Sequence, residues 1–298
     1  MESFAGHTLL RRLDSGGHVE FHEAEPSSGA GDRRLLIRAS AHAERWPPWA
    51  DPALAMILRH HNIVAMHQAA AFENPPFFVL EFIPGCDLRE LLACERLTPD
   101  LACYVVRELC AGLAAALRSR AKDGTHLRWT HGQIGPRAVH LSVHGEVKVS
   151  GFGVGRLKPE DPSPAGVLDE RIALLAPEQA AGSSEESPAP QTDVFLAGAV
   201  LHMMIDGPLL ETDQPGELLR TLARRERGTF SRIRTGISPA LSDLLGAALA
   251  ARPGDRPADA ADVAARLDEL PELRDRGSAA RQLGALVRRC VDVSGRSR

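Results

Sequence analysis

The sequence predicts an α+β fold, with strands concentrated in its first part and helices in the rest. Short apolar runs separated by glycine-containing and polar turns are typical of strands; they fill residues 8–40, and another covers residues 77–83. From residue 98 onwards, apolar residues instead recur at helical spacing in successive longer stretches. A chain of 298 residues can bury a core in one two-lobed domain or in two small domains.

Composition and charge narrow the class of protein. The net charge is −4 without a long run of one sign, so we expect neither a nucleic-acid-binding surface nor a basic membrane-binding patch. The five cysteines form no C-x-x-C pair, and an odd number without a signal peptide favours reduced thiols and a cytoplasmic location. The most apolar run, 194–205, is too short to span a bilayer and is expected to be a buried helix.

The first expected strands flank a glycine pair, in the run Leu13-Asp14-Ser15-Gly16-Gly17-His18-Val19-Glu20-Phe21. Glycines allow backbone N–H groups to approach a phosphate closely, but a plain hairpin turn uses the same residues. A polar turn at 26–32 then leads into a further strand, Leu35-Leu36-Ile37-Arg38.

A short helix is expected next. Pro47 and Pro48 cannot lie inside a helix, whereas Asp51 suits the N-cap and Pro52 the first turn. The helix is therefore placed at 53–59.

A long amphipathic helix follows from Thr98, as the cap, to about residue 119, with Pro99 at its first position. The cysteines at positions 103 and 110 lie within this helix and are expected to pack rather than to bind a metal.

Residues 130–153 join a polar loop to a pair of short strands. The loop, 131–138, is punctuated by glycine and proline, and the strands are expected at 138–141 and 146–149. A loop, hairpin and glycine corner of this kind normally present polar groups at a cleft. Here the only acidic residue between His131 and Gly153 is Glu146, which lies in the hairpin.

The remaining chain is predicted to be mainly helical. The loop 152–175 is rich in proline and acidic residues and has one hydroxyl side chain, Ser163. The last helix has an apolar face, so it either folds onto the large lobe or docks a partner. A flexible linker is expected at 182–191, and helices at 192–205, 215–227, 239–251 (capped by Ser238), 258–270 and 279–293.

Several motifs, in the right order, resemble those of protein kinases, in particular the bacterial Ser/Thr (Hanks-type) family. The resemblance covers about residues 8–270. It implies a bilobal kinase-like fold, with a small β-rich N-lobe at 1–83, a larger helical C-lobe at 84–272 and an amphipathic helical extension at 273–298. The matching residues are the hinge-like run Leu80 to Ile83, His131 and Pro136 of the catalytic loop, Phe152-Gly153, Ala176-Pro177-Glu178, Asp193 and Arg256. Of these, His131, Glu178, Asp193 and Arg256 would hold the large lobe together. The resemblance implies that Asp193 accepts N–H bonds from the loop at His131–Gly132 and that Arg256 pairs with Glu178.

The same alignment shows that the residues at the family's catalytic and metal-binding positions lack the required chemical groups. The catalytic base falls on Gln133 and the loop lysine on Gly135, while the two metal ligands fall on Ala138 and Gly151. Phosphoryl transfer depends on positioning and on charge neutralisation by magnesium. The resemblance therefore implies a pseudokinase, which is not an enzyme, has no magnesium site and uses no cofactor.

The resemblance also locates a vestigial nucleotide pocket. Arg38 replaces the strand lysine, and the larger planar guanidinium is not a conservative change; it either meets phosphate, pairs with Asp51 or is a surface charge. Asp14 puts an anion where phosphate oxygens would lie. Since Leu36 and Phe21 should shrink the pocket, we expect either no ATP binding or weak, metal-independent binding. The expected pocket residues are Leu13, Phe21, Leu36, Arg38, Leu80, Glu81, Ile83 and His140.

Two functions stay open. The first is a non-catalytic module that presents the kinase shape to another protein, of unknown identity, through 152–175, 215–227 or the C-terminal helix. The second is an ATP-binding enzyme, kinase-like or another nucleotidyl or phosphoryl transferase, that recruits acids such as Asp14, Asp161 or Asp169. Acids converging on an open cleft would favour the enzyme, and apolar side chains that fill the cleft would favour the scaffold.

Overall fold

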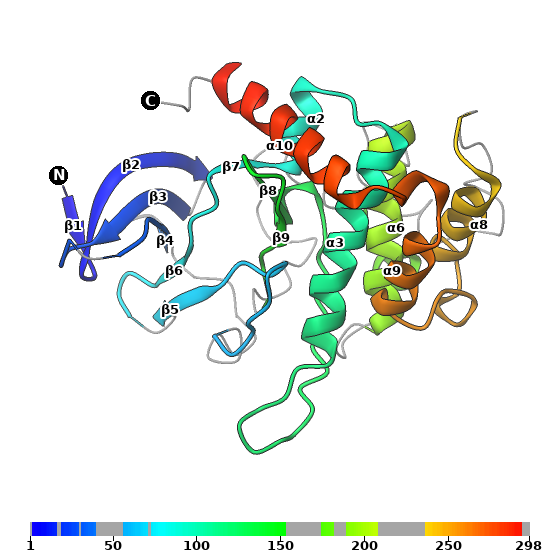
Figure 1. Cartoon of the computed structure of the whole chain (residues 1–298). Helices are drawn as coiled ribbons and strands as arrows, with labels where there is room; N and C mark the ends of the chain where they lie inside the picture. Colours follow the sequence, from blue (N-terminus) through cyan, green and yellow to red (C-terminus); the bar gives the residue numbers. More distant parts are fainter. Residues whose placement is uncertain are drawn as a thin grey trace.

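The chain folds into a strand-rich small lobe and a helical large lobe (Figure 1), which confirms the predicted α+β class. The computed structural model describes residues 2–16, 19–29, 31–39, 56–70, 73–152, 174–181, 189–207 and 236–293.

The small lobe is a six-stranded antiparallel sheet in the order β1-β2-β3-β4-β6-β5. Its first hairpin turns through Ala5 and Gly6, whose φ angles of 50° and 78° are those a two-residue hairpin turn requires. The strands are β1 Glu2–Phe4, β2 His7–Gly16, β3 Val19–Pro26, β4 Arg34–Ala39, β5 Met66–Ala70 and β6 Phe77–Glu81.

The two faces of this sheet have separate apolar clusters, because neighbouring residues of a strand point to opposite sides. Leu36 of β4 belongs to the cluster that also contains Leu9, Ala24, Phe77 and Val79. Leu35 and Ile37 pack on the other face, against the cluster of Val64, Met66, Phe78 and Leu80. Trp129 of the large lobe packs on this second cluster and on the large-lobe core. The second face is therefore the one directed toward the large lobe.

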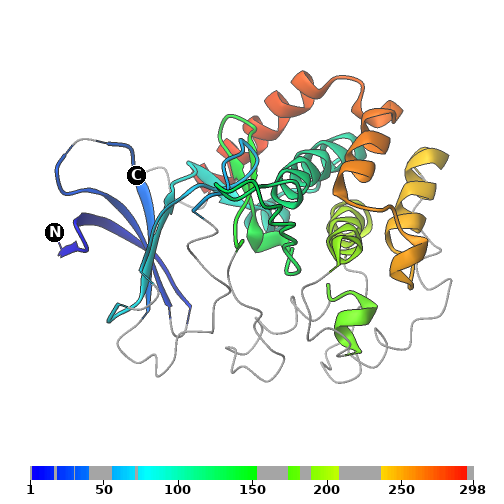
Figure 2. The same ribbon diagram turned by 90° about the horizontal axis from the view of Figure 1, so that it is seen from below.

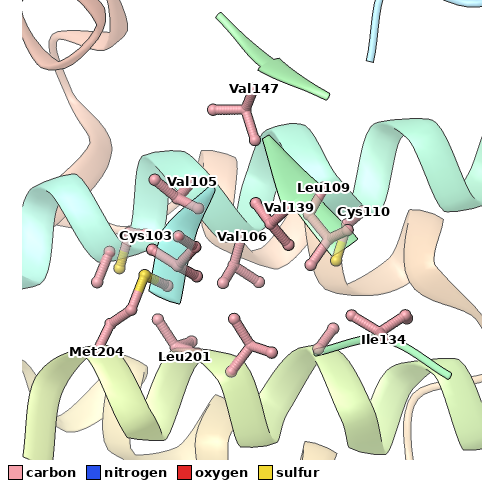
Figure 3. Packing of buried hydrophobic residues seen from close by; sticks show 14 of the residues in the cluster. Cys103, Val105, Val106, Leu109, Cys110, Ile134, Val139, Val147, Leu201 and Met204 are labelled. Atoms are coloured by element: carbon pink, nitrogen blue, oxygen red, sulfur yellow. The ribbon is translucent and has the colours of Figure 1, made fainter. Parts of the chain in front are cut away.

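The large lobe is built around α3 (Pro99–Leu117), which packs against α6 (Pro190–Asp206) and α9 (Ala260–Asp268). Cys103 and Cys110 are fully buried, as predicted for packing residues. Figure 3 shows Cys103 and Val106 of α3 and Leu201 and Met204 of α6 pointing into the space between the two helices. The other elements are β7 Gly85–Asp87, α2 Leu88–Cys94, η1 Pro136–Ala138, β8 Val139–Ser142, β9 Val147–Val149, α5 Pro177–Ala180, α8 Pro239–Ala248, η2 Pro253–Asp255, η3 Pro271–Leu273 and α10 Arg276–Val293.

Several predicted helix ends are displaced by a few residues. Pro190 and Gln191 already belong to α6 and not to the expected linker. Thr98 occupies the N-cap of α3, but its side chain makes no capping hydrogen bond. Ser238 does cap α8, since its hydroxyl accepts from the Leu241 backbone N–H at 3.2 Å. Of the described helices, none is long and apolar enough to cross a bilayer.

The helix expected at 53–59 is described only from residue 56, where the chain forms a turn and not a helix. Asp51, the helix expected at 215–227 and most of the loop 152–175 lie outside the described residues.

The C-terminal helix α10 folds onto the large lobe, where it contacts α2, α3 and the strands β7 and β8. Figure 2 shows it running from the helices toward the strands β7, β8 and β9, which form a second, three-stranded sheet in the described residues. Leu283 and Val287 of α10 are fully buried in this contact. The contact is close because two glycines lie in it: a Cβ on Gly145 would lie 1.9 Å from the Ala280 carbonyl oxygen, and one on Gly284 would lie 2.9 Å from a carbonyl oxygen of the hairpin. Of the two readings of this helix, packing on the large lobe is the correct one.

Candidate functional site

The loop 131–138 is held by the carboxylate of Asp193, in the first turn of α6. The backbone N–H groups of His131 and Gly132 each donate to one of its oxygens at 2.7 Å. Asp193 is only 4% exposed, and a buried carboxylate requires such donors. The expected contact between this helix and the loop is therefore present.

His131 braces the corner that follows the hairpin. Its Nε2 lies 2.8 Å from the Ser150 carbonyl oxygen, and its Nδ1 lies 3.2 Å from the backbone nitrogen of Gln133. The ring therefore donates from Nε2 and accepts at Nδ1. Phe152 packs edge-on against the ring, with the centroids 4.8 Å apart. Both ring nitrogens bind backbone groups, so His131 has a positioning role.

Gly151 forms the corner where the resemblance places a metal-binding aspartate. Its φ is +97°, a conformation that side-chain-bearing residues rarely adopt, and a Cβ there would lie 3.3 Å from Nε2 of His131. Glycine suits this backbone, and a carboxylate introduced at the same position would be strained.

The four positions at which the resemblance places the base, the lysine and the two metal ligands lie along this loop and corner, and their side chains offer no carboxylate. Gly135 faces Leu174, whose Cδ1 would be 3.5 Å from an added Cβ. The carbonyl of Ala138 accepts from the Ser150 backbone N–H at 2.9 Å, so this position contributes its backbone to the corner. Within the described ranges, no three His, Cys, Asp or Glu residues are grouped as a metal site would need.

The sheet register divides the expected nucleotide pocket. Phe21 is opposite Ile37, and Leu35 is opposite Leu80. Residues directly opposite each other in an antiparallel sheet share a face. Phe21 and Leu80 therefore lie on the face directed toward the large lobe. Leu13 is only partly buried and lies at an irregularity in the pairing of β2 with β3.

Leu36 and Arg38 lie on the opposite face, which corrects the expected pocket. Leu36 is opposite Val79 and is fully buried in the outer cluster. It therefore does not fill a nucleotide pocket together with Phe21. On the face toward the large lobe, β4 instead presents Leu35 and Ile37, which are both apolar.

Arg38 is engaged by two carboxylates of the small lobe. Its Nε donates to Glu20 at 2.7 Å and its Nη1 donates to Glu2 at 2.6 Å. The guanidinium carbon lies 5.2 Å from the centre of the Phe4 ring. The hydrogen bonds from Arg38 lower the pKa of both glutamates. Neither partner was foreseen, because both lie far from Arg38 in the sequence; the suggested partner Asp51 lies outside the described residues.

The hinge-like segment carries a contact between the lobes. Leu80 is buried, whereas Glu81 accepts from Lys148 Nζ at 2.8 Å and from the Ala65 backbone N–H at 3.2 Å. Ile83 packs on the cluster beneath the sheet. The Glu81 side chain therefore makes structural contacts within the protein. The side chain of Asp14, and residues 161 and 169, lie outside what the structure describes.

His140 of β8 is opposite Asp87 of β7 and Lys148 of β9 in the small sheet of the large lobe. Its Nε2 lies 2.7 Å from Oγ of Ser150. Burial lowers the pKa of His140 to about 4. The ring is therefore neutral at pH 7.

The depressed pKa of His140 predicts a specific pH dependence. As the pH falls from 6.5, the ordinary histidine value, towards 4, the unfolded chain binds a proton before the folded protein does. The free energy of unfolding should therefore fall over this range, by up to about 3 kcal/mol from this residue. Urea unfolding at a series of pH values would measure it. His140→Leu should flatten this part of the profile, and identical profiles for the two proteins would contradict the expectation.

Two neighbouring residues of α5 hold this part of the large lobe together, and the one that binds the loop, Gln179, was not predicted from the sequence. Gln179 of α5 donates from Nε2 to the Gly132 carbonyl at 2.7 Å, and its Oε1 accepts from the Ala176 backbone N–H at 3.0 Å. It follows the Ala-Pro-Glu motif directly, which is the signal that could have identified it. Glu178 binds Arg256 through two hydrogen bonds of 2.7 and 2.8 Å, as expected from the resemblance.

Comparison with known proteins points to one family. A family model described as "Protein tyrosine and serine/threonine kinase" matches residues 49–267. The chain is 30% identical to the serine/threonine-protein kinase PknL of Mycobacterium tuberculosis, with 89% of the chain and 65% of PknL aligned. It is 24% identical to the tyrosine-protein kinase MasK of Myxococcus xanthus, over 97% of the chain and 46% of MasK. The similarity to the serine/threonine-protein kinase PknB of Mycolicibacterium smegmatis is 26% over 73% of the chain and 35% of PknB. The chain thus spans at most 65% of the length of these relatives.

Proposed function

Because the chain belongs to the protein kinase family and has bacterial Ser/Thr kinases among its relatives, we propose that it is a pseudokinase domain, which binds another protein and transfers no phosphate. The observation that carries the proposal is the identity of four residues of the loop and corner. The base and lysine positions hold Gln133 and Gly135, and the metal positions hold Ala138 and Gly151. The domain acts in the cytoplasm, without a cofactor and without nucleic acid as a partner.

The chemistry of phosphoryl transfer explains why these four residues matter. The reaction needs magnesium to neutralise charge and a group that accepts the substrate proton. Ala138 and Gly151 have no ligand atoms in their side chains, and the amide of Gln133 takes no proton at neutral pH. Loss of one preorganised stabilising group commonly lowers a rate about a hundred-fold or more. The separate losses do not simply add, but together they leave ordinary kinase activity below detection.

The small lobe supports the same proposal. Leu35 and Ile37 of β4 are directed toward the large lobe, and alkyl groups cannot neutralise phosphate charge. The guanidinium of Arg38 is already paired with two glutamates on the other face. We therefore expect nucleotide binding to be absent, or weak and independent of metal.

The contacts that keep the shape of the large lobe are intact, in contrast to the chemical groups. Asp193 still holds the loop, and Glu178 still binds Arg256. A domain that needs only its surface to bind a partner would retain these contacts and lose the others.

An ATP-dependent enzyme with non-standard residues is the second candidate. The names of the relatives favour it, since PknL and PknB are both named serine/threonine-protein kinases. It would require acids from elsewhere in the chain, such as Asp14, Asp161 or Asp169, to reach the cleft.

A phosphotransfer assay tests the proposal directly. The purified protein, incubated with γ-labelled ATP and either magnesium or manganese, should label neither itself nor a general protein substrate. Ile83→Trp, which should obstruct the hinge, is the control for contaminating kinases. Label that appears with the natural chain and disappears with Ile83→Trp would establish the enzyme instead.

Nucleotide binding is tested separately by thermal unfolding during titration with ATP, with and without magnesium. A ligand at 100 times its dissociation constant stabilises a protein by about 2.7 kcal/mol. We expect no shift, or a small shift that magnesium does not increase. A magnesium-dependent shift would contradict the inferred loss of both metal ligands.

A further inference from the structure

Three cysteines from three different elements meet where α10 packs on the large lobe. Cys86 lies in β7, Cys94 ends α2 and Cys290 lies near the end of α10. The thiols of Cys86 and Cys290 are within hydrogen-bonding reach of each other. The sulfur atoms of Cys94 and Cys290 are 3.0 Å apart, although the residues are 196 positions apart in the sequence. Cys290 Sγ also lies 3.5 Å from the Glu90 carbonyl oxygen. All three are thiols, and no disulfide links them.

The two close thiols differ in their access to solvent. Cys94 is exposed, whereas Cys290 is 3% exposed. Burial and the hydrogen bond with Cys94 raise the pKa of Cys290 to about 12, so Cys290 is protonated at neutral pH. A dissolved oxidant therefore reaches Cys94 first, and Cys290 is in place to react with the product.

We propose that Cys94 and Cys290 form a peroxide-sensitive pair that closes into an intramolecular disulfide. The Cys94 thiolate attacks one oxygen of hydrogen peroxide, the O–O bond breaks and a sulfenic acid forms, while the other oxygen leaves as water. The sulfur of Cys290 then attacks the Cys94 sulfur, the S–O bond breaks and the Cys290 proton leaves with the hydroxide as a second water. The two thiols lose two electrons, which reduce the peroxide. A dithiol reductant reverses the change by thiol–disulfide exchange.

The geometry requires little movement for this reaction. A disulfide bond is about 2 Å long, so the two sulfur atoms need to approach by about 1 Å. The neighbouring residues also link the two elements, since Arg289 donates to Glu95, the C-cap of α2, through hydrogen bonds of 3.1 and 2.9 Å. The disulfide would link α10 covalently to α2. Because α10 packs on β8, it would also restrain the hairpin that follows the loop 131–138.

The proposal is tested on the whole chain by treating the reduced protein with a modest excess of hydrogen peroxide. Alkylation and peptide mass mapping should show that two of the five thiols are lost and that Cys94 is linked to Cys290. The melting temperature should rise by roughly 5–10 °C, because the cross-link closes a long loop. Dithiothreitol should restore both thiols and the original melting temperature. In the oxidised protein, amide exchange in α10 should slow.

Matched variants separate this pair from other outcomes. Cys94→Ser changes an exposed residue and should fold normally, form no internal disulfide and show no rise in melting temperature on oxidation. Cys86→Ala should still form the link. A product that joins Cys86 to Cys290, a dimer joined through Cys94, or five unchanged thiols in the treated natural chain would each overturn the proposal.

Discussion

Arg256→Ala is expected to cost about 3–5 kcal/mol of stability, because it leaves the partly buried carboxylate of Glu178 without its cation. The Arg256 side chain is fully buried, and all five of its N–H donors are used. Nε and Nη2 bind the Ala250 and Ala251 carbonyls, Nη1 binds the Gln191 carbonyl, and the two terminal nitrogens bind Glu178. The melting temperature should fall by roughly 10 °C or more.

Two further variants make this result interpretable. Arg252→Ala removes an exposed arginine from the same segment and should change stability by no more than about 0.5 kcal/mol. Arg256→Lys keeps the charge but loses the planar fork, so its effect should be intermediate. If Arg256→Ala does not fold, Arg256→Lys and Glu178→Gln still report on the contact. Equal losses for Arg256→Ala and Arg252→Ala would show that the buried pair contributes nothing.

Gly145→Ala should have a comparable effect, by displacing α10. A methyl group at Gly145 would lie 1.9 Å from the carbonyl oxygen of Ala280, and the φ of +86° already disfavours any side chain. The hydroxyl of Tyr104, in α3, donates to the Gly145 carbonyl at 3.0 Å and so holds the turn against α3. The left-handed conformation costs about 1–2 kcal/mol, and forcing extra volume into a close contact adds about 1–3 kcal/mol. Chemical denaturation would measure the total.

Gly124→Ala is the matched control for Gly145→Ala. Gly124 has nearly the same φ, +87°, but no atom lies within 4 Å of an added Cβ. It should lose only the conformational part, about 1–2 kcal/mol. Hydrogen exchange should show faster opening of α10 in Gly145→Ala and unchanged exchange of α10 in Gly124→Ala. Equal losses of stability for the two variants would mean that the close approach of α10 contributes nothing.

Contacts that belong to a short motif could be predicted from the sequence. Asp193 was expected to hold the loop at His131 and Gly132, and Arg256 was expected to bind Glu178. In each case the resemblance to protein kinases identified both partners in advance, because each partner belongs to a matched motif. The α+β class followed from the change in apolar periodicity along the chain, since strands and helices bury their faces at different intervals.

The face on which a strand residue lies was harder to predict. Since the side-chain period of a strand is two, a register shift of one residue exchanges the two faces. The sequence of β4 is apolar at three consecutive positions, so its pattern alone does not distinguish Leu36 from Leu35 and Ile37. The pairing of β4 with β3 and β6 decides which face each of its residues occupies, and this pairing depends on residues that are distant in the sequence. The glycine contacts of α10 were not predictable either, because they depend on how closely two backbones approach.

The docking of α10 has a practical consequence for truncation. The match to the family model ends at residue 267, whereas α10 runs from 276 to 293. A fragment that stopped at the end of the match would uncover the apolar surfaces of α2, α3 and β8 that this helix covers. Newly uncovered apolar patches of this kind promote self-association. A soluble recombinant fragment should therefore extend at least to Val293.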